Sequence, residues 1–281
     1  MSNDGSGDSE APVAVGGVGG SGTRLVASLL QASGIHLGTD LNVANDTLWF
    51  TLLFKRAEVL AASDTAFDAA CQVLTAALTG GQPLDPPLLA FIREHAAVDR
   101  PQHSSQWLLE RAHTLAAAAA HPAHHQRWGW KEPNTHIVIE RLWKRLPHLR
   151  YVHVVRHGVD MAFSSNQNQL QLWGPHVLGE DGPVTPARSL AYWCHIQQYM
   201  QRLLANNAER MYWLDYDALC REPEPVLDDL CRFLALDPGQ CRSRYPEVRQ
   251  QPARGATQLT DDAVSEDVAY VRSLGYEIPA A

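Results

Sequence analysis

The sequence predicts an α/β fold in which a parallel sheet carries helices on both faces. Short apolar segments beginning at Val13, Trp128, Tyr151 and Met211 alternate with stretches of helical spacing. Strands that alternate with helices form parallel sheets, and connections of this kind are right-handed crossovers. In such sheets the ligand lies at the carboxyl ends of the strands. We therefore look for function in the residues that directly follow each strand.

Length and composition describe an ordinary globular protein. The 281 residues are 45% hydrophobic and 19% charged, which suits one domain over 12–281 behind a disordered tail at 1–11. The formal net charge of −8 argues against a nucleic-acid partner. The sequence contains no run of about 18 apolar residues, so no membrane span is predicted. Five scattered cysteines without C-x-x-C spacing, and no signal peptide, predict free thiols and a cytoplasmic location.

A glycine-rich turn follows the first apolar segment and leads into a helical stretch that starts near Leu25. Backbone N–H groups of such a turn, together with a helix N-terminus, bind phosphate. The loop consists of Gly19, Gly20, Ser21, Gly22, Thr23 and Arg24. The spacing of Gly17, Gly19 and Gly22 also fits a dinucleotide fingerprint, whereas Thr23 and Arg24 stand where a Walker A motif needs Lys and Ser/Thr. The loop alone leaves the identity of the anion open.

The remaining elements follow in order along the chain. Residues 34–38 form a short second strand or its approach, and 47–125 form a helical insertion that ends in a loop. A strand from Trp128 stops at a proline, and the run 151–155 is the most strand-like of the chain. Three prolines and three glycines predict a long flexible loop over 174–187. Helices over 188–209 and 225–234 flank a last strand at 211–214.

Anion-binding side chains stand at three predicted strand ends. The glycine loop follows the first strand, Lys131 ends another, and Arg156 ends a third, with Ser164 eight residues later. A dinucleotide dehydrogenase needs one pyrophosphate turn and an acidic residue, so it has no use for these groups together. The pattern favours a ligand with more than one charged phosphate or sulfate group.

These motifs resemble the sulfotransferases that use 3′-phosphoadenosine 5′-phosphosulfate (PAPS). The stretch 20–25 (Gly-Ser-Gly-Thr-Arg-Leu) is similar to the first loop of that family, and 151–164 is similar to its strand that delivers an Arg and then a Ser. Residues 130–133 resemble the Lys-x-Pro strand end of bacterial and tyrosylprotein-type members. Residues 214–219 resemble the Tyr-Glu-Asp-Leu segment. The likeness runs from Val13 to Leu236.

The resemblance implies a three-layer P-loop-like fold and a set of residue roles. The loop at 19–24 would hold the 5′-phosphosulfate, and Arg156 and Ser164 would grip the 3′-phosphate. Tyr216 would lie beside the adenosine. Arg254 and Gly255 are similar to a late loop that closes over the 3′-phosphate.

Sulfuryl transfer is an in-line displacement that needs alignment and fixed positive charge. Lys131 is the candidate for stabilising the charge that develops, and no metal is then required. The acceptor hydroxyl must lose a proton, so a base is needed. Asp46 and Asp40 are the leading candidates, ahead of His157, His136 and Glu132. Gly20 stands where the family has a basic residue, and Arg24 is the candidate substitute for that charge.

Two other functions stay open at this point. A small-molecule kinase with a degenerate P-loop would need ATP and Mg²⁺. A non-catalytic nucleotide-binding protein would bind adenosine 3′,5′-bisphosphate and transfer nothing. The sequence does not select among small-molecule, glycan and peptide hydroxyl acceptors, and it does not determine the oligomeric state.

Overall fold

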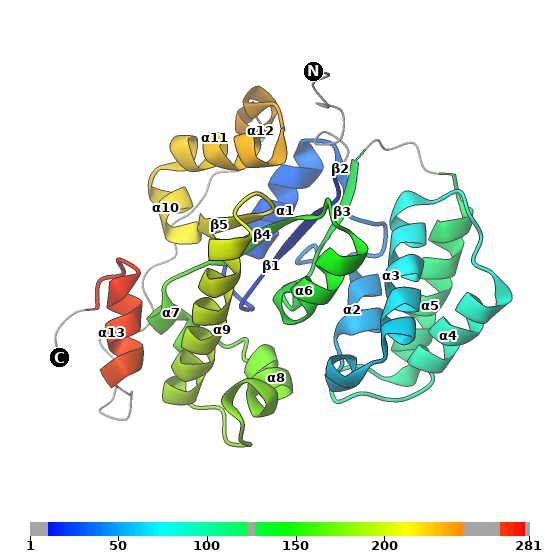
Figure 1. The fold of residues 1–281 in the computed structure, drawn as a ribbon, viewed down its shortest axis with the longest axis horizontal. Helices are drawn as coiled ribbons and strands as arrows, with labels where there is room; N and C mark the ends of the chain where they lie inside the picture. The colour runs from blue at the N-terminus through cyan, green and yellow to red at the C-terminus, as the bar shows by residue number, and fades with distance from the viewer. Residues whose placement is uncertain (1–10, 123–126, 244–264, 279–281) are drawn as a thin grey trace.

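Five parallel strands form one sheet in the structure, a computed structural model that describes residues 11–122, 127–243 and 265–278. The strands lie in the order β2 (Ile35–His36), β3 (Arg127–Lys131), β1 (Val13–Gly17), β4 (Arg150–Val155) and β5 (Met211–Asp215). All four pairings are parallel. The predicted α/β class with a parallel sheet is confirmed (Figure 1).

Helices cover both faces of this sheet and make three layers. β1 is buried along its whole length, as a central parallel strand must be. Side chains that alternate along β4 enter two separate cores. Val152 and Val154 pack with α1 (Thr23–Ala32) and α11 (Pro223–Leu234). Tyr151 and Val155 pack on the other side, with α6 (Thr135–Arg145) and α9 (Pro186–Asn206).

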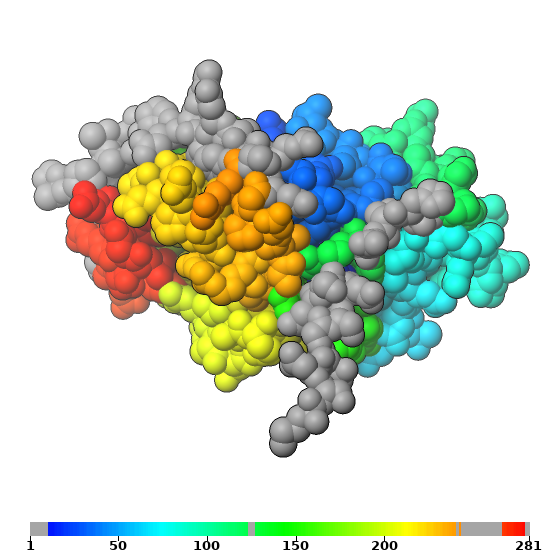
Figure 2. Space-filling view, turned by 90° about the horizontal axis from the view of Figure 1, so that it is seen from above, coloured from blue at the N-terminus to red at the C-terminus, as the bar shows by residue number. Residues whose placement is uncertain are grey.

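The segment between β2 and β3 is helical, as predicted for the insertion. It contains α2 (Leu48–Phe54), a 3₁₀ helix η1 (Ala57–Ala61), α3 (Asp64–Thr79), α4 (Pro86–Ala96) and α5 (Ser105–Ala120). Ser63, Asp85 and Ser104 cap α3, α4 and α5 by accepting a backbone N–H at 3.2, 2.9 and 3.2 Å. Figures 1 and 2 show α3 and α4 in cyan at one end of the molecule, opposite the red helix α13 (Ser265–Ser273).

The predicted loop at 174–187 is wrong over its first part. Helix α8 (Asn168–Leu178) continues through Pro175 and ends at Gly179, so the loop spans only 179–185 before α9. Trp173 explains the difference, since it is fully buried and its Nε1 donates to Asn134 Oδ1 at 2.7 Å. This packing outweighs the one backbone hydrogen bond that the proline removes near the end of the helix.

The elements α7 (Gly158–Ala162), α10 (Tyr216–Arg221) and α12 (Pro238–Ser243) complete the described part of the chain. α7 begins directly after β4, and α10 begins directly after β5. The starts of both helices therefore lie at the carboxyl edge of the sheet, the edge that the glycine loop also occupies. Among the described helices, none is long and apolar enough to cross a membrane.

Candidate active site

A cavity of about 310 Å³ lies at the carboxyl ends of β1, β3 and β4, which are neighbours in the sheet. Its lining includes Gly20, Gly22, Thr23, Arg24, Lys131 and Arg156. Asp46, Ser164 and Tyr216 line the same cavity. The structure therefore brings the three predicted strand ends together, from segments that are far apart in the sequence.

The N-terminus of α1 directly follows the glycine loop, and its residues Gly22, Thr23 and Arg24 contribute to the lining of this cavity. Gly22 is the N-cap residue of α1 with φ 97°, a backbone conformation that other residues rarely adopt, and no side chain caps the helix. A Cβ at Gly22 would lie 2.1 Å from the ring of Tyr216. The close approach needs glycine here, and the first N–H groups of α1 stay available for an anion.

Other residues of the loop are in close contact with β4 and with the segment that precedes α8. A Cβ at Gly17 would lie 2.3 Å from Val154 O, and one at Gly19 would lie 3.1 Å from Asn166 Nδ2. Ser21 is 1% exposed, and its buried Oγ has no hydrogen-bond partner among the described residues. This hydroxyl lies next to Gly17, 2.9 Å from the position of a Cβ there, and Ser21 is not part of the cavity lining.

Arg156 is placed by Asp160 and Tyr216. Its Nη2 donates to Asp160 Oδ2 at 3.1 Å, and its guanidinium carbon lies 5.6 Å from the Tyr216 ring centroid. The side chain is 8% exposed, and no described residue accepts from its buried Nε. Ser164 lies nearby, since its Oγ is 3.3 Å from the position of a Cβ at Gly20. Arg156 therefore keeps donor capacity for an anion in the cavity.

Lys131 and Asp46 form an ion pair in the lining of the cavity. The Lys131 side chain is 3% exposed and its Nζ pairs with Asp46 Oδ1, while it also donates to Ala44 O at 3.0 Å. Asn42 Nδ2 donates to Asp46 Oδ2 at 2.8 Å, which orients the carboxylate. The backbone N–H of Thr47 donates to Lys131 O at 2.7 Å, so the loop that carries Asp46 is attached to β3.

Asp40 belongs to the same loop but is held on α5. It forms an ion pair with Arg111 Nε at 2.8 Å and accepts from Thr114 Oγ1 at 2.5 Å. Thr114 Oγ1 in turn accepts from Trp49 Nε1 at 3.0 Å. Asp40 is not part of the cavity lining, so its visible role is to fix the loop to the helical insertion.

The other base candidates also lie outside the lining. His157 Nδ1 accepts from Val159 N at 3.2 Å and its Nε2 contacts Glu277 O at 3.0 Å, so both ring nitrogens are occupied. Burial lowers the pKa of His136 to about 3. Glu132 is buried, which raises the pKa of its carboxyl, and it accepts from Asn134 N at 2.6 Å. Among the described lining residues, Asp46 is the carboxylate that does not hold Arg156.

Arg24 is exposed at the first turn of α1 and lines the cavity, whereas the predicted pair Arg254 and Gly255 lies outside the described residues. Sequence reasoning missed Asn166 and Gln169. Gln169 is 5% exposed and donates to Gly17 O at 3.1 Å, so it holds the glycine loop from α8. The polar run 164–169 was the available signal, but no periodicity connects it to the loop.

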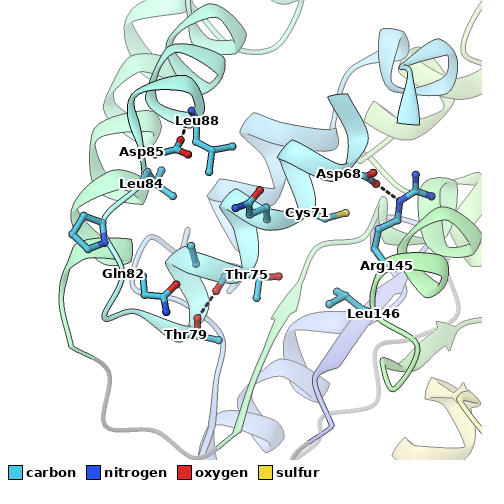
Figure 3. A pocket seen from close by; sticks show the side chains of 13 residues that line it. Asp68, Cys71, Thr75, Thr79, Gln82, Leu84, Asp85, Leu88, Arg145 and Leu146 are labelled. Atoms are coloured by element: carbon cyan, nitrogen blue, oxygen red, sulfur yellow. Dashed lines mark hydrogen bonds and ion pairs between the residues drawn. The ribbon is translucent and has the colours of Figure 1, made fainter. Parts of the chain in front are cut away.

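A larger cavity, of about 460 Å³, lies within the helical insertion (Figure 3). It is bounded by α3, the linker to α4 and the end of α6. Its arginine is paired, since Arg145 Nε donates to Asp68 Oδ1 at 2.5 Å, and Asp85 accepts from the backbone N–H of Leu88 at 2.9 Å. Burial raises the pKa of the Cys71 thiol there to about 12, so this thiol is a poor nucleophile. No strand of the described sheet ends in its lining.

The profile of the sulfotransferase family matches residues 12–238 of the chain. The chain belongs to the sulfotransferase family, and this membership implies PAPS as the sulfonate donor. The function implied by the resemblance, that of a sulfotransferase, is therefore confirmed at the level of the family.

Solved structures give more distant likenesses. The sulfotransferase domain of the Synechococcus PCC 7002 olefin synthase is 16% identical, with a TM-score of 0.47 and coverage of 96% of this chain and 97% of that chain. A sulfotransferase from Alicyclobacillus acidocaldarius is 14% identical, with a TM-score of 0.48 and coverage of 94% and 95%. One from Mycobacterium avium is 16% identical, with a TM-score of 0.48 and coverage of 96% and 78%. The comparison with curated proteins gives no match.

Proposed function

We propose that this sulfotransferase moves a sulfonate group from PAPS to a hydroxyl acceptor in the cavity at the ends of β1, β3 and β4. The observation that carries the proposal is the convergence of an open helix N-terminus, Lys131 and Arg156 on one cavity that also contains the carboxylate of Asp46. PAPS supplies the sulfonate group and a phosphate leaving group. The residues of this chain supply binding, alignment and the removal of one proton.

The donor would be held at two places. The N–H groups at the start of α1 and Thr23 in the cavity lining fit the 5′-phosphosulfate, and Ser21 of the same loop remains a candidate from the family resemblance. Arg156 and Ser164 fit the 3′-phosphate, since Arg156 keeps a buried Nε without a described partner. Tyr216 packs over Gly22 and beside Arg156, which suits a position next to the adenosine.

Asp46 is our candidate for the general base. Its carboxylate lines the cavity and is held by Lys131 and Asn42, so it is placed to accept the proton of the acceptor hydroxyl. Lys131 then faces the charge that develops on the leaving oxygen, in a buried position where a fixed positive charge is most effective. Asp40 is a loop anchor in this scheme, because Arg111 and Thr114 hold it elsewhere.

Arg24 is our candidate for the cation that the family places at the position of Gly20. Gly20 has φ 100°, so the loop conformation disfavours a basic side chain at that position. Arg24 reaches the same cavity from the first turn of α1. Undiminished turnover of Arg24→Ala would refute this role.

The donor site is tested by calorimetric titration with adenosine 3′,5′-bisphosphate, ADP and NAD. We expect the bisphosphate to bind most tightly, and Arg156→Ala to weaken it by about 10- to 100-fold, since a charge-assisted hydrogen bond contributes about 1.5–3 kcal/mol. ADP should lose little in the same variant, because it lacks the 3′-phosphate. Equal binding of the bisphosphate and ADP by the native chain would contradict the proposal and favour a kinase.

The base is tested by comparing Asp46→Asn with Asp40→Asn, two isosteric changes in one loop. We expect Asp46→Asn to lower kcat about 10²–10⁴-fold, the usual contribution of a general base. Asp40→Asn should lower the melting temperature, because it weakens the contact with Arg111, and it should change kcat much less than Asp46→Asn does. The measurement is acceptor-dependent release of the bisphosphate with the best alcohol of a panel. The reverse pattern would assign the base to Asp40, and bisphosphate binding without any transfer would indicate a non-catalytic binder.

A further inference from the structure

A second cavity, also of about 310 Å³, lies beside the start of η1, the connection 99–103 and helix α8. Its lining includes Lys55, Arg56, Glu58, Arg100, His103 and Gln171. Two segments join it to the active site. Asp46 precedes α2 and Lys55 directly follows α2, while Asn166 precedes α8 and Gln171 lies within α8. At a rise of about 1.5 Å per residue, α2 separates the two sites by about 10 Å.

Positive charge prevails in this cavity. Arg100 directs its guanidinium to three backbone carbonyls, those of Thr51, Leu52 and His95, at 2.8 to 3.1 Å. These carbonyls fix the guanidinium but do not neutralise it. No carboxylate of the described residues lies within ion-pair distance of Lys55 or Arg100. In a chain with a formal net charge of −8, this is an unusual local surplus.

Two carboxylates, Glu58 and Asp99, lie in the same lining, so the three cations Lys55, Arg56 and Arg100 exceed them by one charge. Glu58 forms one ion pair of 3.4 Å, with the Nε of Arg56, which leaves the two terminal nitrogens of that guanidinium for another acceptor. Asp99 is occupied by the backbone N–H of Ser105 at 2.5 Å. Lys55 and the outer edge of Arg56 therefore form a place for an anion.

The electrostatic effect of these cations is felt by two titratable neighbours. Burial, and then Lys55 and Arg100, lower the pKa of His103 to about 4, so this side chain stays neutral. Burial raises the pKa of Glu132 next to Lys131, and Lys55 opposes this rise. Lys55 thus acts electrostatically on the strand end that carries Lys131. The second cavity is separate from the cavity at the strand ends, and helix α8, with Asn166 shortly before it, contributes to the lining of both.

We propose that the second cavity binds an anionic group of the acceptor, so that the acceptor is an alcohol with a carboxylate or similar anion about 10 Å from its reacting hydroxyl. Lys55 and Arg56 would hold the anion, and Ala57, Pro101 and Leu172 would contact the carbon chain. This assignment rests on the proposed function, because it needs the hydroxyl to reach Asp46.

The test uses the protein saturated with adenosine 3′,5′-bisphosphate, so that an anionic probe cannot enter the donor site. Calorimetric titration compares ω-hydroxyoctanoate with α,ω-octanediol, an uncharged probe of similar length. We expect the hydroxy acid to bind at least about tenfold more tightly, and Lys55→Gln to remove most of that preference without affecting the diol. Lys144→Gln is the matched control, since Lys144 is an exposed lysine on α6, and both affinities should be unchanged.

A charge-reversal variant distinguishes loss of the anion site from general destabilisation of the protein. Lys55→Glu should exclude ω-hydroxyoctanoate and favour ω-aminooctanol, whereas a merely destabilised variant would lose all probes together. If the bisphosphate itself does not bind, the proposed function fails. If the bisphosphate binds but the hydroxy acid binds no better than the diol, or neither is detected, this inference is overturned and the donor site stands.

Discussion

Two cavities of the molecule differ in a way that size does not reveal. The larger one, of about 460 Å³, lies between α3 and α4 (Figure 3), and the one at the strand ends has about 310 Å³. In the larger cavity Asp68 and Arg145 satisfy each other, and Arg145 also contacts Asp64 at 2.8 Å. At the strand ends, Ser21 Oγ and Arg156 Nε are buried without a described partner.

The difference between these two cavities lies in how their polar groups are paired rather than in their volume. A cavity between packed helices arises wherever side chains do not fill the space, and its polar groups then pair within the protein. A ligand site keeps part of its hydrogen-bonding capacity for the ligand. Two pairs of substitutions and one chemical modification test this distinction.

The largest effect should come from the buried lysine. We expect Lys131→Ala to lower kcat about 10²–10³-fold, the magnitude for loss of one group that stabilises transition-state charge. Arg145→Ala in the larger cavity should leave kcat unchanged, since its partners are largely exposed carboxylates. Steady-state kinetics with melting curves for both variants makes the measurement. Equal losses of kcat would show that the two cavities do not differ in function.

A second effect concerns two glycines with similar backbones. Gly22 has φ +97° and Gly81 has φ +82°, but a Cβ at Gly22 would meet the Tyr216 ring at 2.1 Å, whereas nothing lies within 4 Å at Gly81. Gly81→Ala should cost about 1–2 kcal/mol of unfolding free energy, the strain of a left-handed residue, and leave bisphosphate affinity unchanged.

Gly22→Ala should cost more and also weaken bisphosphate binding more than tenfold, because the loop or Tyr216 must move. Chemical denaturation and calorimetry measure the two quantities. Native affinity in Gly22→Ala would show that the close approach of this loop to Tyr216 is not needed for the donor.

The smallest effect is the expected inertness of Cys71. Burial is the main cause that raises the pKa of this thiol to about 12, so the thiolate is scarce below that pH and alkylation should accelerate only as the pH approaches it. Peptide mapping after iodoacetamide treatment at pH 8 should find Cys71 unmodified in the folded protein and modified in urea. Rapid alkylation of folded protein would indicate an activated thiol and a function for the larger cavity.

Much of the active site was predictable because its residues follow strands. Apolar segments before Gly19, Lys131 and Arg156 place these groups at one edge of a parallel sheet, whatever the details of packing. The second cavity was not predictable in the same way. Lys55 and Arg100 line it together because the connection 99–103 packs against α2, where Arg100 donates to Thr51 O and Leu52 O, and no sequence motif indicates that contact.

The sequence by itself determined which polar residues follow the strands, where the glycine loop lies and where the helical insertion lies. These features depend on local periodicity and backbone freedom. Only the tertiary structure separated Asp46 from Asp40. Both are acidic residues of one polar turn, but Lys131 holds Asp46 in the cavity lining whereas Arg111 holds Asp40 outside it. The same long-range packing kept Pro175 within α8. Contacts between segments remote in sequence leave no local pattern in the sequence, so only the tertiary structure reveals them.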